Sequence, residues 1–389
     1  MLSRKHSMPS TPLLDRLSGM LEQRRRKGLF RSIAPVHPSE SIIDCSTNSY
    51  LGLHANPAVA QEAEHLAQGT FHGNGASRLV STASRLYDEL EQEIADWEGT
   101  ESALVFTSGY AANIGILQAL CNRSTEVYSD RLNHASLYDG IRLSGCRLIR
   151  YHHCDMDDLR QRLAASTAPE KLIVTDTVFS MDGDRAPLSV IAELGRRYGA
   201  MIMVDEAHGT GMFGKHCSGL VEQTGVSDAI DIRMGTLSKA VAGLGGYVAV
   251  SELLRNILVN FSRSLIYSTG LPHPVLAHNL AAIQYIRKNP EVAARARDGS
   301  DKLRNELNLL GFDTRPSTTQ IVPCIIGNDA EAVALSGYLR SNGIIAPAIR
   351  PPTVPAGTAR IRFSWSSLHT DHDRNRIIES LGNWKKLHE

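Results

Sequence analysis

The feature that most constrains the fold is a short apolar run at residues 201–204 (Met-Ile-Met-Val), which ends in Asp205. A run of this length, rich in large apolar residues, is typical of a strand buried inside an α/β sheet. In open α/β sheets, ligands bind at the carboxyl ends of the strands. We therefore predict that Asp205 stands at a ligand site, with His208 one turn further along the chain.

A second feature is Lys239, which lies between two hydroxyl residues, Thr236 and Ser238, and a glycine-rich turn at residues 243–246. The flanking residues are apolar, so we expect a partly desolvated amine whose pKa is lowered by burial. A lysine in that state can be a nucleophile or can form a Schiff base with an aldehyde. Taken alone, the pattern also suits an ordinary lysine beside a turn.

The acid and the lysine together predict a cofactor. A buried carboxylate is costly unless it meets a cation, and the protonated ring nitrogen of pyridoxal 5'-phosphate (PLP) would supply one for Asp205. A lysine that forms the Schiff base and an acid that pairs with the ring nitrogen are the two groups expected for PLP. Asp205 and Lys239 supply both types of group.

Composition argues against several other classes of protein. The 389 residues suggest roughly two or three domains, and the 41 basic and 41 acidic residues give a net charge of zero. Bulk attraction to nucleic acid or to a membrane is therefore not expected. Six scattered cysteines favour reduced thiols and a cytoplasmic location. The sequence predicts neither a signal peptide nor a membrane-spanning run.

Hydrophobic periodicity predicts the main elements. Helices are expected at residues 12–28, 86–97, 330–341 and 371–384, and strands at 103–106, 126–128, 172–176 and 320–326. The order after residue 271 suits a small α+β layer. Two histidines, His152 and His153, are not expected to bind a metal, because neighbouring residues on a strand point to opposite faces.

Several blocks of the sequence together resemble the α-oxoamine synthase family of PLP enzymes. The blocks are residues 48–53, 107–113, 133–136, 178–184, 205–211, 236–247 and 349–362. The resemblance implies the α/β fold of PLP-dependent transferases, with a mostly parallel mixed sheet in a large domain and a smaller α+β domain. The implied parts are an amino-terminal helix and arm (1–48), the large PLP domain (49–271) and the carboxyl-terminal domain (272–389).

The resemblance also implies the residues that bind the cofactor. Ser108, Gly109 and Tyr110 begin a predicted helix, whose amino terminus is a ready anion site for the phosphate. His134 is expected to stack on the ring. The full set of implied cofactor residues is Ser108, Gly109, Tyr110, His134, Ser180, Asp205, His208, Thr236 and Lys239, with Ser268 and Thr269 reaching the phosphate of a neighbouring subunit. Lys239, His134 and Asp205 are the implied catalytic residues.

Substrate contacts are implied at both ends of the chain. Arg31, His134, Thr353 and Arg362 match family residues that touch substrate, and the fork of Arg362 is expected to hold a carboxylate. Arg360 lies on the same face of its predicted strand and is expected to be an exposed charge at the strand end.

The block at residues 349–362 is most similar to family members that join L-alanine to pimeloyl-CoA or a pimeloyl-carrier protein in biotin biosynthesis. A homodimer with shared active sites is implied. Other family reactions stay open: glycine C-acetyltransferase, 5-aminolevulinate synthase and serine palmitoyltransferase share almost all of the site. Thr82, Ser84 and Tyr87 depart from the family pattern and leave the acyl group open. A non-catalytic partner subunit is a further alternative, although such a subunit is expected to lack the lysine.

Overall fold

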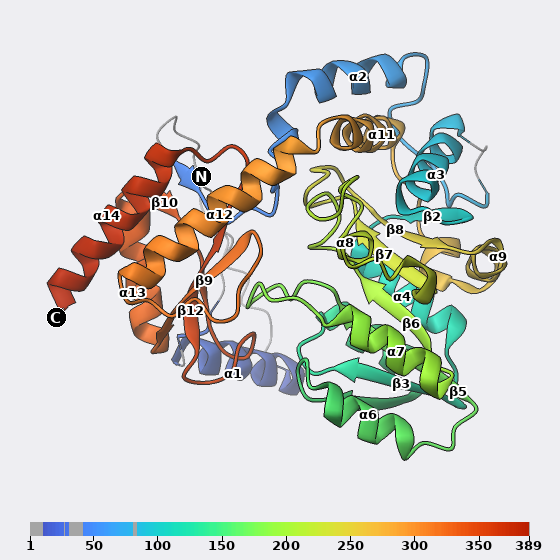
Figure 1. Ribbon diagram of the computed structural model, residues 1–389, viewed down its shortest axis with the longest axis horizontal. Helices are drawn as coiled ribbons and strands as arrows, with labels where there is room; N and C mark the ends of the chain where they lie inside the picture. The colour runs from blue at the N-terminus through green and yellow to red at the C-terminus, as the bar shows by residue number, and fades with distance from the viewer. Residues whose placement is uncertain (1–10, 27, 31–41, 81–83, 389) are drawn as a thin grey trace. The chain divides into compact units, whose positions relative to one another are not determined.

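A computed structural model describes residues 11–26, 28–30, 42–80 and 84–388 (Figure 1). The chain divides into two compact units, Met1–Ile42 and Ile43–Glu389. The first unit contains α1 (Pro12–Arg26), which matches the helix expected at residues 12–28 but ends slightly earlier, in a run of arginines. Arg31 and Thr82 lie outside the described residues. The three-part domain division stays a prediction.

The centre of the larger unit is a seven-stranded sheet with the order β2-β8-β7-β6-β5-β3-β4. Its strands are β2 (Ser102–Phe106), β3 (Thr125–Asp130), β4 (Arg147–Tyr151), β5 (Glu170–Asp176), β6 (Met201–Asp205), β7 (Ile232–Thr236) and β8 (Gly246–Val250). All pairs are parallel except those that β8 makes with β2 and β7. The apolar run that ends in Asp205 forms β6, the middle strand, so the predicted buried strand and α/β class are confirmed.

Helices cover both faces of this sheet, which explains why its strands are apolar without alternation. On β5 and β6, Val174 and Met203 pack with α4 and α5, whereas Ile173 and Val204 pack on the opposite side with α7 and α11. The helices are α2 (Pro57–Ala67), α3 (Arg85–Glu98), α4 (Gly109–Leu120), α5 (Ala135–Ser144), α6 (Met156–Ala164), α7 (Leu188–Tyr198), α8 (Leu220–Thr224), α9 (Glu252–Phe261), α10 (Arg263–Ile266) and α11 (His273–Lys288).

A smaller three-stranded sheet follows in the chain, with the order β11-β12-β9 and antiparallel pairs. Its strands are β9 (Ile321–Gly327), β11 (Ala348–Ile349) and β12 (Ala359–Ser364), and its helices are α12 (Glu291–Leu309), α13 (Asp329–Ser341) and α14 (Asp371–His388). A short pair, β1 (Ile43–Asp44) and β10 (Ile344–Ile345), joins the start of this unit to the same region. The strand predicted at residues 320–326 and the helices predicted at 330–341 and 371–384 correspond to β9, α13 and α14, but three strands rather than the expected two separate α13 from α14.

The longest helices described, α12 and α14, both carry charged residues along their length. In the part of the chain that the structure describes, no helix has both the length and the apolar character needed to cross a bilayer.

Candidate active site

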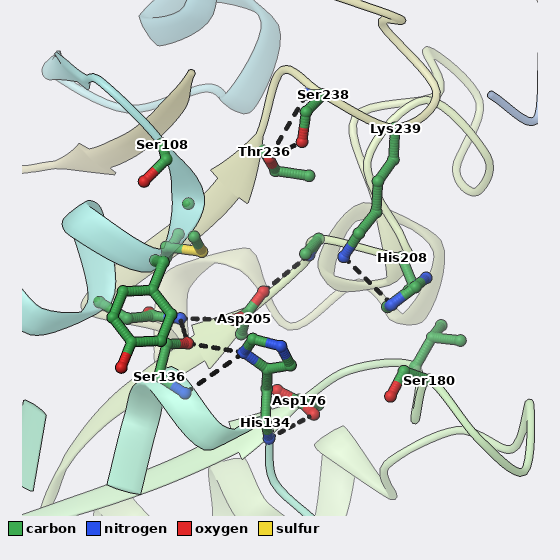
Figure 2. Close-up of a pocket in the computed structure, with 16 residues that line it drawn as sticks. Ser108, His134, Ser136, Asp176, Ser180, Asp205, His208, Thr236, Ser238 and Lys239 are labelled. Carbon is green, nitrogen blue, oxygen red and sulfur yellow. Dashed lines mark hydrogen bonds between the residues drawn. The ribbon is translucent and has the colours of Figure 1, made fainter. Parts of the chain in front are cut away.

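A cavity of about 270 Å³ opens at the carboxyl edge of the large sheet (Figure 2). Three neighbouring parallel strands each end in a residue that lines it: Asp176 on β5, Asp205 on β6 and Thr236 on β7. The predicted site residues that line this cavity are Ser108, Gly109, Tyr110, His134, Ser180, Asp205, His208, Thr236 and Lys239. Residues up to 131 positions apart in the chain therefore meet at the carboxyl ends of the strands, where the apolar run before Asp205 predicted a ligand site.

The remaining predicted residues lie elsewhere. Arg362 is buried behind the cavity wall, on β12. Thr353 is exposed in the segment between β11 and β12. Ser268 and Thr269 follow α10 and do not line the cavity of their own chain; Thr269 instead forms an isolated bridge with Ser77.

Lys239 follows β7 and is half-buried, with its Nζ 3.1 Å from Nε2 of His208. Desolvation lowers the pKa of Lys239 to about 8, although the charges of Asp205 and Asp176 oppose this shift. Arg362 adds a smaller effect in the same direction as desolvation. The direction expected from the apolar flanks is therefore confirmed, and the amine is partly neutral near physiological pH.

Two residues that the sequence analysis did not assign to the site, Tyr50 and Asn48, determine which ring nitrogen of His208 carries the proton. The Tyr50 hydroxyl lies 2.6 Å from His208 Nδ1 and donates to Asn48 Oδ1 at 3.0 Å. Because that hydroxyl proton points to Asn48, Nδ1–H of His208 donates to Tyr50. Nε2 is then the acceptor that faces the Lys239 ammonium. The pKa of His208 is held well below its usual value, chiefly by burial and then by the charge of Lys239.

Asp205 is held in one orientation by two donors. Its Oδ2 accepts from the Asn113 side chain at 2.7 Å, and its Oδ1 accepts from the backbone N–H of Ala207 at 2.8 Å. Asn113 lies on α4 and also donates to the Ser136 hydroxyl. A buried carboxylate fixed in this way can present a constant negative charge to a ligand in the cavity.

Asp176 is a site residue that the sequence analysis missed. It lies opposite Asp205 in the register of β5 and β6, and one of its oxygens accepts from the His134 backbone N–H at 3.0 Å. Burial raises its pKa well above the usual value, and the charge of Asp205 acts in the same direction. Its other oxygen, like the side-chain oxygen of Asn113, is buried without a hydrogen-bond partner in the described structure. The signal was present, since Asp176 also ends a buried strand.

His134 enters the cavity from the start of α5, where its Nδ1 lies 2.7 Å from the Ser136 hydroxyl. The pKa of His134 is lowered, chiefly by desolvation among the surrounding residues. Its ring is exposed to the cavity rather than packed into the core.

The amino terminus of α4 forms another wall. Ser108 caps this helix: its hydroxyl accepts from the Ala111 N–H and its carbonyl accepts from the Ala112 N–H, both at 3.0 Å. The N–H groups of Gly109 and Tyr110 lie in the first turn and have no partner within the helix. A Cβ atom at Gly109 would lie 2.9 Å from the terminal methyl of Met234 and 3.3 Å from the Thr236 hydroxyl, so a side chain here would have to displace its neighbours. Free N–H groups beside hydroxyls make a ready anion site.

Arg362 is the cation nearest to the site from the small sheet. Its Nε donates to the carbonyl of Ser180 at 2.6 Å, and both terminal nitrogens lie 3.2 Å from Asn48 Oδ1. Arg360 lies on the same face, as expected, but it is only 2% exposed and pairs with Asp182. The expectation of an exposed Arg360 was therefore wrong, because the turn at residues 178–185 covers this face of β12.

Residues 40–381 match the family model described as aminotransferase class I and II. The chain belongs to this family. Among its curated relatives, the 8-amino-7-oxononanoate synthase of Geobacter sulfurreducens is 44% identical over 94% of this chain and 96% of its own length. The enzyme of the same name from Geobacter metallireducens is 46% identical over 91% of each chain. These relatives confirm the resemblance expected from the motifs.

Solved structures of PLP enzymes have the same fold as this aminotransferase-family chain. Sphingomonas wittichii serine palmitoyltransferase has a TM-score of 0.91 at 28% identity, covering 98% of this chain and 99% of its own. A further serine palmitoyltransferase, solved with PLP, has a TM-score of 0.89 at 28% identity, covering 97% and 99%. The 8-amino-7-oxononanoate synthase from Francisella tularensis has a TM-score of 0.76 at 26% identity, covering 90% and 99%.

The residues present fit PLP, which is the cofactor of this family site. Lys239 supplies an amine of lowered pKa, and Asp205 supplies a fixed carboxylate. The start of α4 offers unpaired N–H groups for a phosphate, and the unpartnered oxygens of Asp176 and Asn113 leave room for a donor. A cofactor with a cationic ring nitrogen and a phosphate would supply partners for these unpaired acceptors and donors.

Proposed function

We propose that the protein condenses L-alanine with a pimeloyl thioester and releases carbon dioxide and the thiol. The product is 8-amino-7-oxononanoate, a precursor of biotin. The observation that carries the proposal is the 44% identity, over 94% of the chain, to an enzyme named for this product. Lys239, Asp205 and Arg362, the three residues on which such a reaction depends, are all present at or beside one cavity.

Lys239 would hold the cofactor through its amine, and Asp205 would hold a proton on the ring nitrogen. PLP supplies an acceptor for the electron pair that remains when a bond at the amino acid's Cα breaks. Lys239 then removes the Cα proton as a general base, for which a pKa of about 8 is well suited. Ser108, Gly109 and Thr236 would hold the phosphate, and His134 would contact the ring.

Arg362 binds the carboxylate of L-alanine. Its Nε contact with the Ser180 carbonyl fixes the guanidinium beside a residue that lines the cavity. Its charge also helps to lower the pKa of Lys239, so the two groups are electrostatically coupled. An arginine fork recognises a carboxylate with two parallel hydrogen bonds, which orients the Cα proton toward one side of the cofactor.

We further propose a cytoplasmic homodimer in which Ser268 and Thr269 complete the phosphate site of the neighbouring subunit. Support comes from their position outside the cavity of their own chain. Thr353 and Arg31 are assigned to substrate contact by the same resemblance. The pimeloyl group can be carried by CoA or by a carrier protein.

A serine palmitoyltransferase-like reaction is the second candidate, because structures of that enzyme have the higher TM-scores. Fold similarity is shared by enzymes that use different acyl groups, so it does not select the substrate. Sequence identity differs more: 44% to the oxononanoate enzyme against 28% to the palmitoyltransferase. A non-catalytic partner subunit is disfavoured by the presence of Lys239.

Mass spectrometry of reaction products tests the proposal. The purified protein with PLP is given L-alanine and pimeloyl-CoA, glycine and acetyl-CoA, or L-serine and palmitoyl-CoA. We expect 8-amino-7-oxononanoate and carbon dioxide from the first pair only. Product from glycine or serine alone would overturn the assigned reaction and leave the cofactor chemistry intact. A parallel reaction with a pimeloyl-carrier protein identifies the preferred donor.

A further inference from the structure

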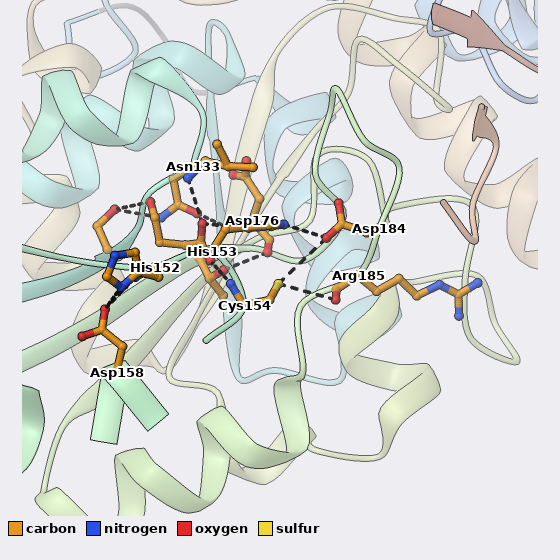
Figure 3. A network of polar contacts seen from close by, with 12 residues as sticks. Asn133, His152, His153, Cys154, Asp158, Asp176, Asp184 and Arg185 are labelled. Carbon is orange, nitrogen blue, oxygen red and sulfur yellow. Dashed lines mark hydrogen bonds and ion pairs between the residues drawn. The ribbon is translucent and has the colours of Figure 1, made fainter. Parts of the chain in front are cut away.

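Two adjacent histidines after β4 have different surroundings (Figure 3). His152 is exposed and contacts one carboxylate, Asp158, at 2.8 Å. His153 turns inward and lies between two carboxylates, with Nδ1 3.0 Å from Asp130 and Nε2 2.8 Å from Asp184. The two histidines thus diverge, although they lie in a turn and not on the strand that the sequence analysis assumed.

The contact between His153 and Asp130 holds the turn that leads to His134. Asp130 is the last residue of β3, and its Oδ1 also accepts from the Leu132 N–H at 2.8 Å. Its Oδ2 accepts from the Cys154 N–H at 2.8 Å. The chain then runs directly into His134 at the start of α5. His153 is therefore joined, through Asp130, to the segment that sets the direction of the His134 ring.

The contact between His153 and Asp184 holds the turn that carries Ser180. Besides the Asp184 contact, the His153 ring meets Phe179 edge to face, with ring centres 4.4 Å apart. The turn is closed by a backbone bond from the Phe179 N–H to the Asp184 carbonyl at 3.0 Å. Ser180, next in the chain, lines the cavity and accepts from Arg362 through its carbonyl.

The two contacts of His153 with Asp130 and Asp184 are charge-assisted. Two carboxylate acceptors on the two ring nitrogens require both nitrogens to be donors, which is the protonated form of the ring. The two carboxylates raise the pKa of His153 to about 12, against the opposing effect of desolvation. Asp130 and Asp184 are both buried, and charge-assisted hydrogen bonds of this kind are stronger than neutral ones. A ring with both nitrogens protonated has no lone pair for a metal.

We propose that His153 is a positioning residue for the condensation reaction, because it joins the His134 turn to the Ser180 turn and so fixes two walls of the cofactor cavity. The proposal rests on the proposed function. It assigns His153 no contact with substrate. It divides the effect between two contacts: Asp130 acts on the turn that carries His134, and Asp184 acts on the turn that carries Ser180, which lines the cofactor cavity and also contacts Arg362.

Three variants of the full-length protein test this assignment: His153→Gln, Asp184→Asn and the matched control His152→Gln. For each, fluorescence titration of the apo-protein gives the PLP dissociation constant. Absorption titration of the PLP-loaded protein with L-alanine gives the amino-acid dissociation constant. Thermal unfolding checks that each variant is folded. Both titrations measure binding and do not depend on the product assay. If the proposed reaction is wrong, the wild-type protein alone shows this in the product assay.

We expect Asp184→Asn to weaken L-alanine binding about tenfold and PLP binding by a smaller factor. Arg362, which the Ser180 turn holds, is proposed to bind the amino acid, whereas PLP is also held by Lys239 and the start of α4. His153→Gln should weaken both, and His152→Gln neither. Wild-type affinities in folded His153→Gln and Asp184→Asn would overturn the proposal. Equal loss of both affinities in Asp184→Asn, together with a lowered unfolding temperature, would also overturn it, since that is general destabilisation. If His153→Gln does not fold, Asp184→Asn decides.

Discussion

The cofactor cavity and the His153 cluster contain similar charged groups, but the pKa of the basic side chain shifts in opposite directions in the two places. Each places two buried carboxylates near a basic side chain, and both lie beyond the carboxyl ends of parallel strands. In the cluster, Asp130 and Asp184 contact the two nitrogens of His153 directly. In the cavity, Lys239 is hydrogen-bonded to His208 instead of to either of its two nearby carboxylates.

The difference in contact decides the sign of the pKa shift. Direct carboxylate contact raises the pKa of His153 to about 12, so its ring is protonated near neutral pH. Desolvation without such contact lowers the pKa of Lys239 to about 8, so its amine can lose a proton and react. A basic group in direct contact with carboxylates keeps its proton and supports the structure. A desolvated basic group without such a contact can lose its proton and take part in chemistry.

The largest effect is expected from removing the reactive group of the cavity. Lys239→Ala should lower kcat by at least about 10³-fold, because it removes both the attachment point of PLP and the general base. Turnover is measured with L-alanine and pimeloyl-CoA, and covalent PLP is measured by mass after reduction. His153→Gln is the comparison variant, which should keep covalent PLP. A Lys239→Ala protein with normal turnover would refute the role of the lysine.

A smaller effect is expected from neutralising the cavity acid. Asp205→Asn should leave PLP bound but slow removal of the alanine Cα proton by about 10²-fold, because a neutral ring accepts the electron pair poorly. The rate is followed as exchange of the Cα proton with solvent deuterium. Exchange at the wild-type rate would count against a charged partner for the ring nitrogen.

These two residues were predictable from sequence, and their partners were not. Asp205 ends a strand whose apolar run is visible in the chain, and Lys239 stands out by its hydroxyl and glycine neighbours. The strand before Lys239, β7, contains Arg233 and Gly235 and was not predicted. Asp176 obeys the same rule and was overlooked. Tyr50 contacts His208 across 158 positions of sequence, and no periodicity encodes such a contact.

The same limit explains the two arginines of β12. Alternation along the strand correctly predicted that Arg360 and Arg362 share a face. It could not predict that the turn at residues 178–185 covers that face, because the turn comes from a distant part of the chain. Burial of Arg360 is a tertiary fact, and its partner Asp182 became apparent only in three dimensions.

The pH dependence of cofactor attachment sharpens the comparison. Only the neutral amine of Lys239 can bond to PLP, and its fraction rises as pH rises toward its pKa of about 8. The rate of covalent attachment to the apo-protein should therefore increase about tenfold per pH unit below pH 8 and level off above it. His153 stays protonated throughout this range, so the cluster is unchanged. Stopped-flow absorbance measures the rate, and a pH-independent rate between pH 6 and 9 would contradict the shifted lysine.

The smallest effect is expected from removing the Tyr50 hydroxyl, which contacts Nδ1 of His208. Tyr50→Phe removes the acceptor of the His208 Nδ1–H and leaves that group buried without a partner. We expect kcat/KM for L-alanine to fall about fivefold to tenfold, with a shifted pH profile, since one hydrogen bond is lost. Steady-state kinetics across pH measures both changes. An unchanged profile would show that His208 keeps its tautomer without Tyr50.

We propose that the cavity, and not the His153 cluster beside it, binds PLP through Lys239. The most direct measurement is peptide mass mapping after the protein is incubated with PLP and reduced with borohydride. We predict one PLP per chain, attached to the peptide that contains Lys239. Attachment to another lysine, or no attachment to the folded protein, would contradict the account.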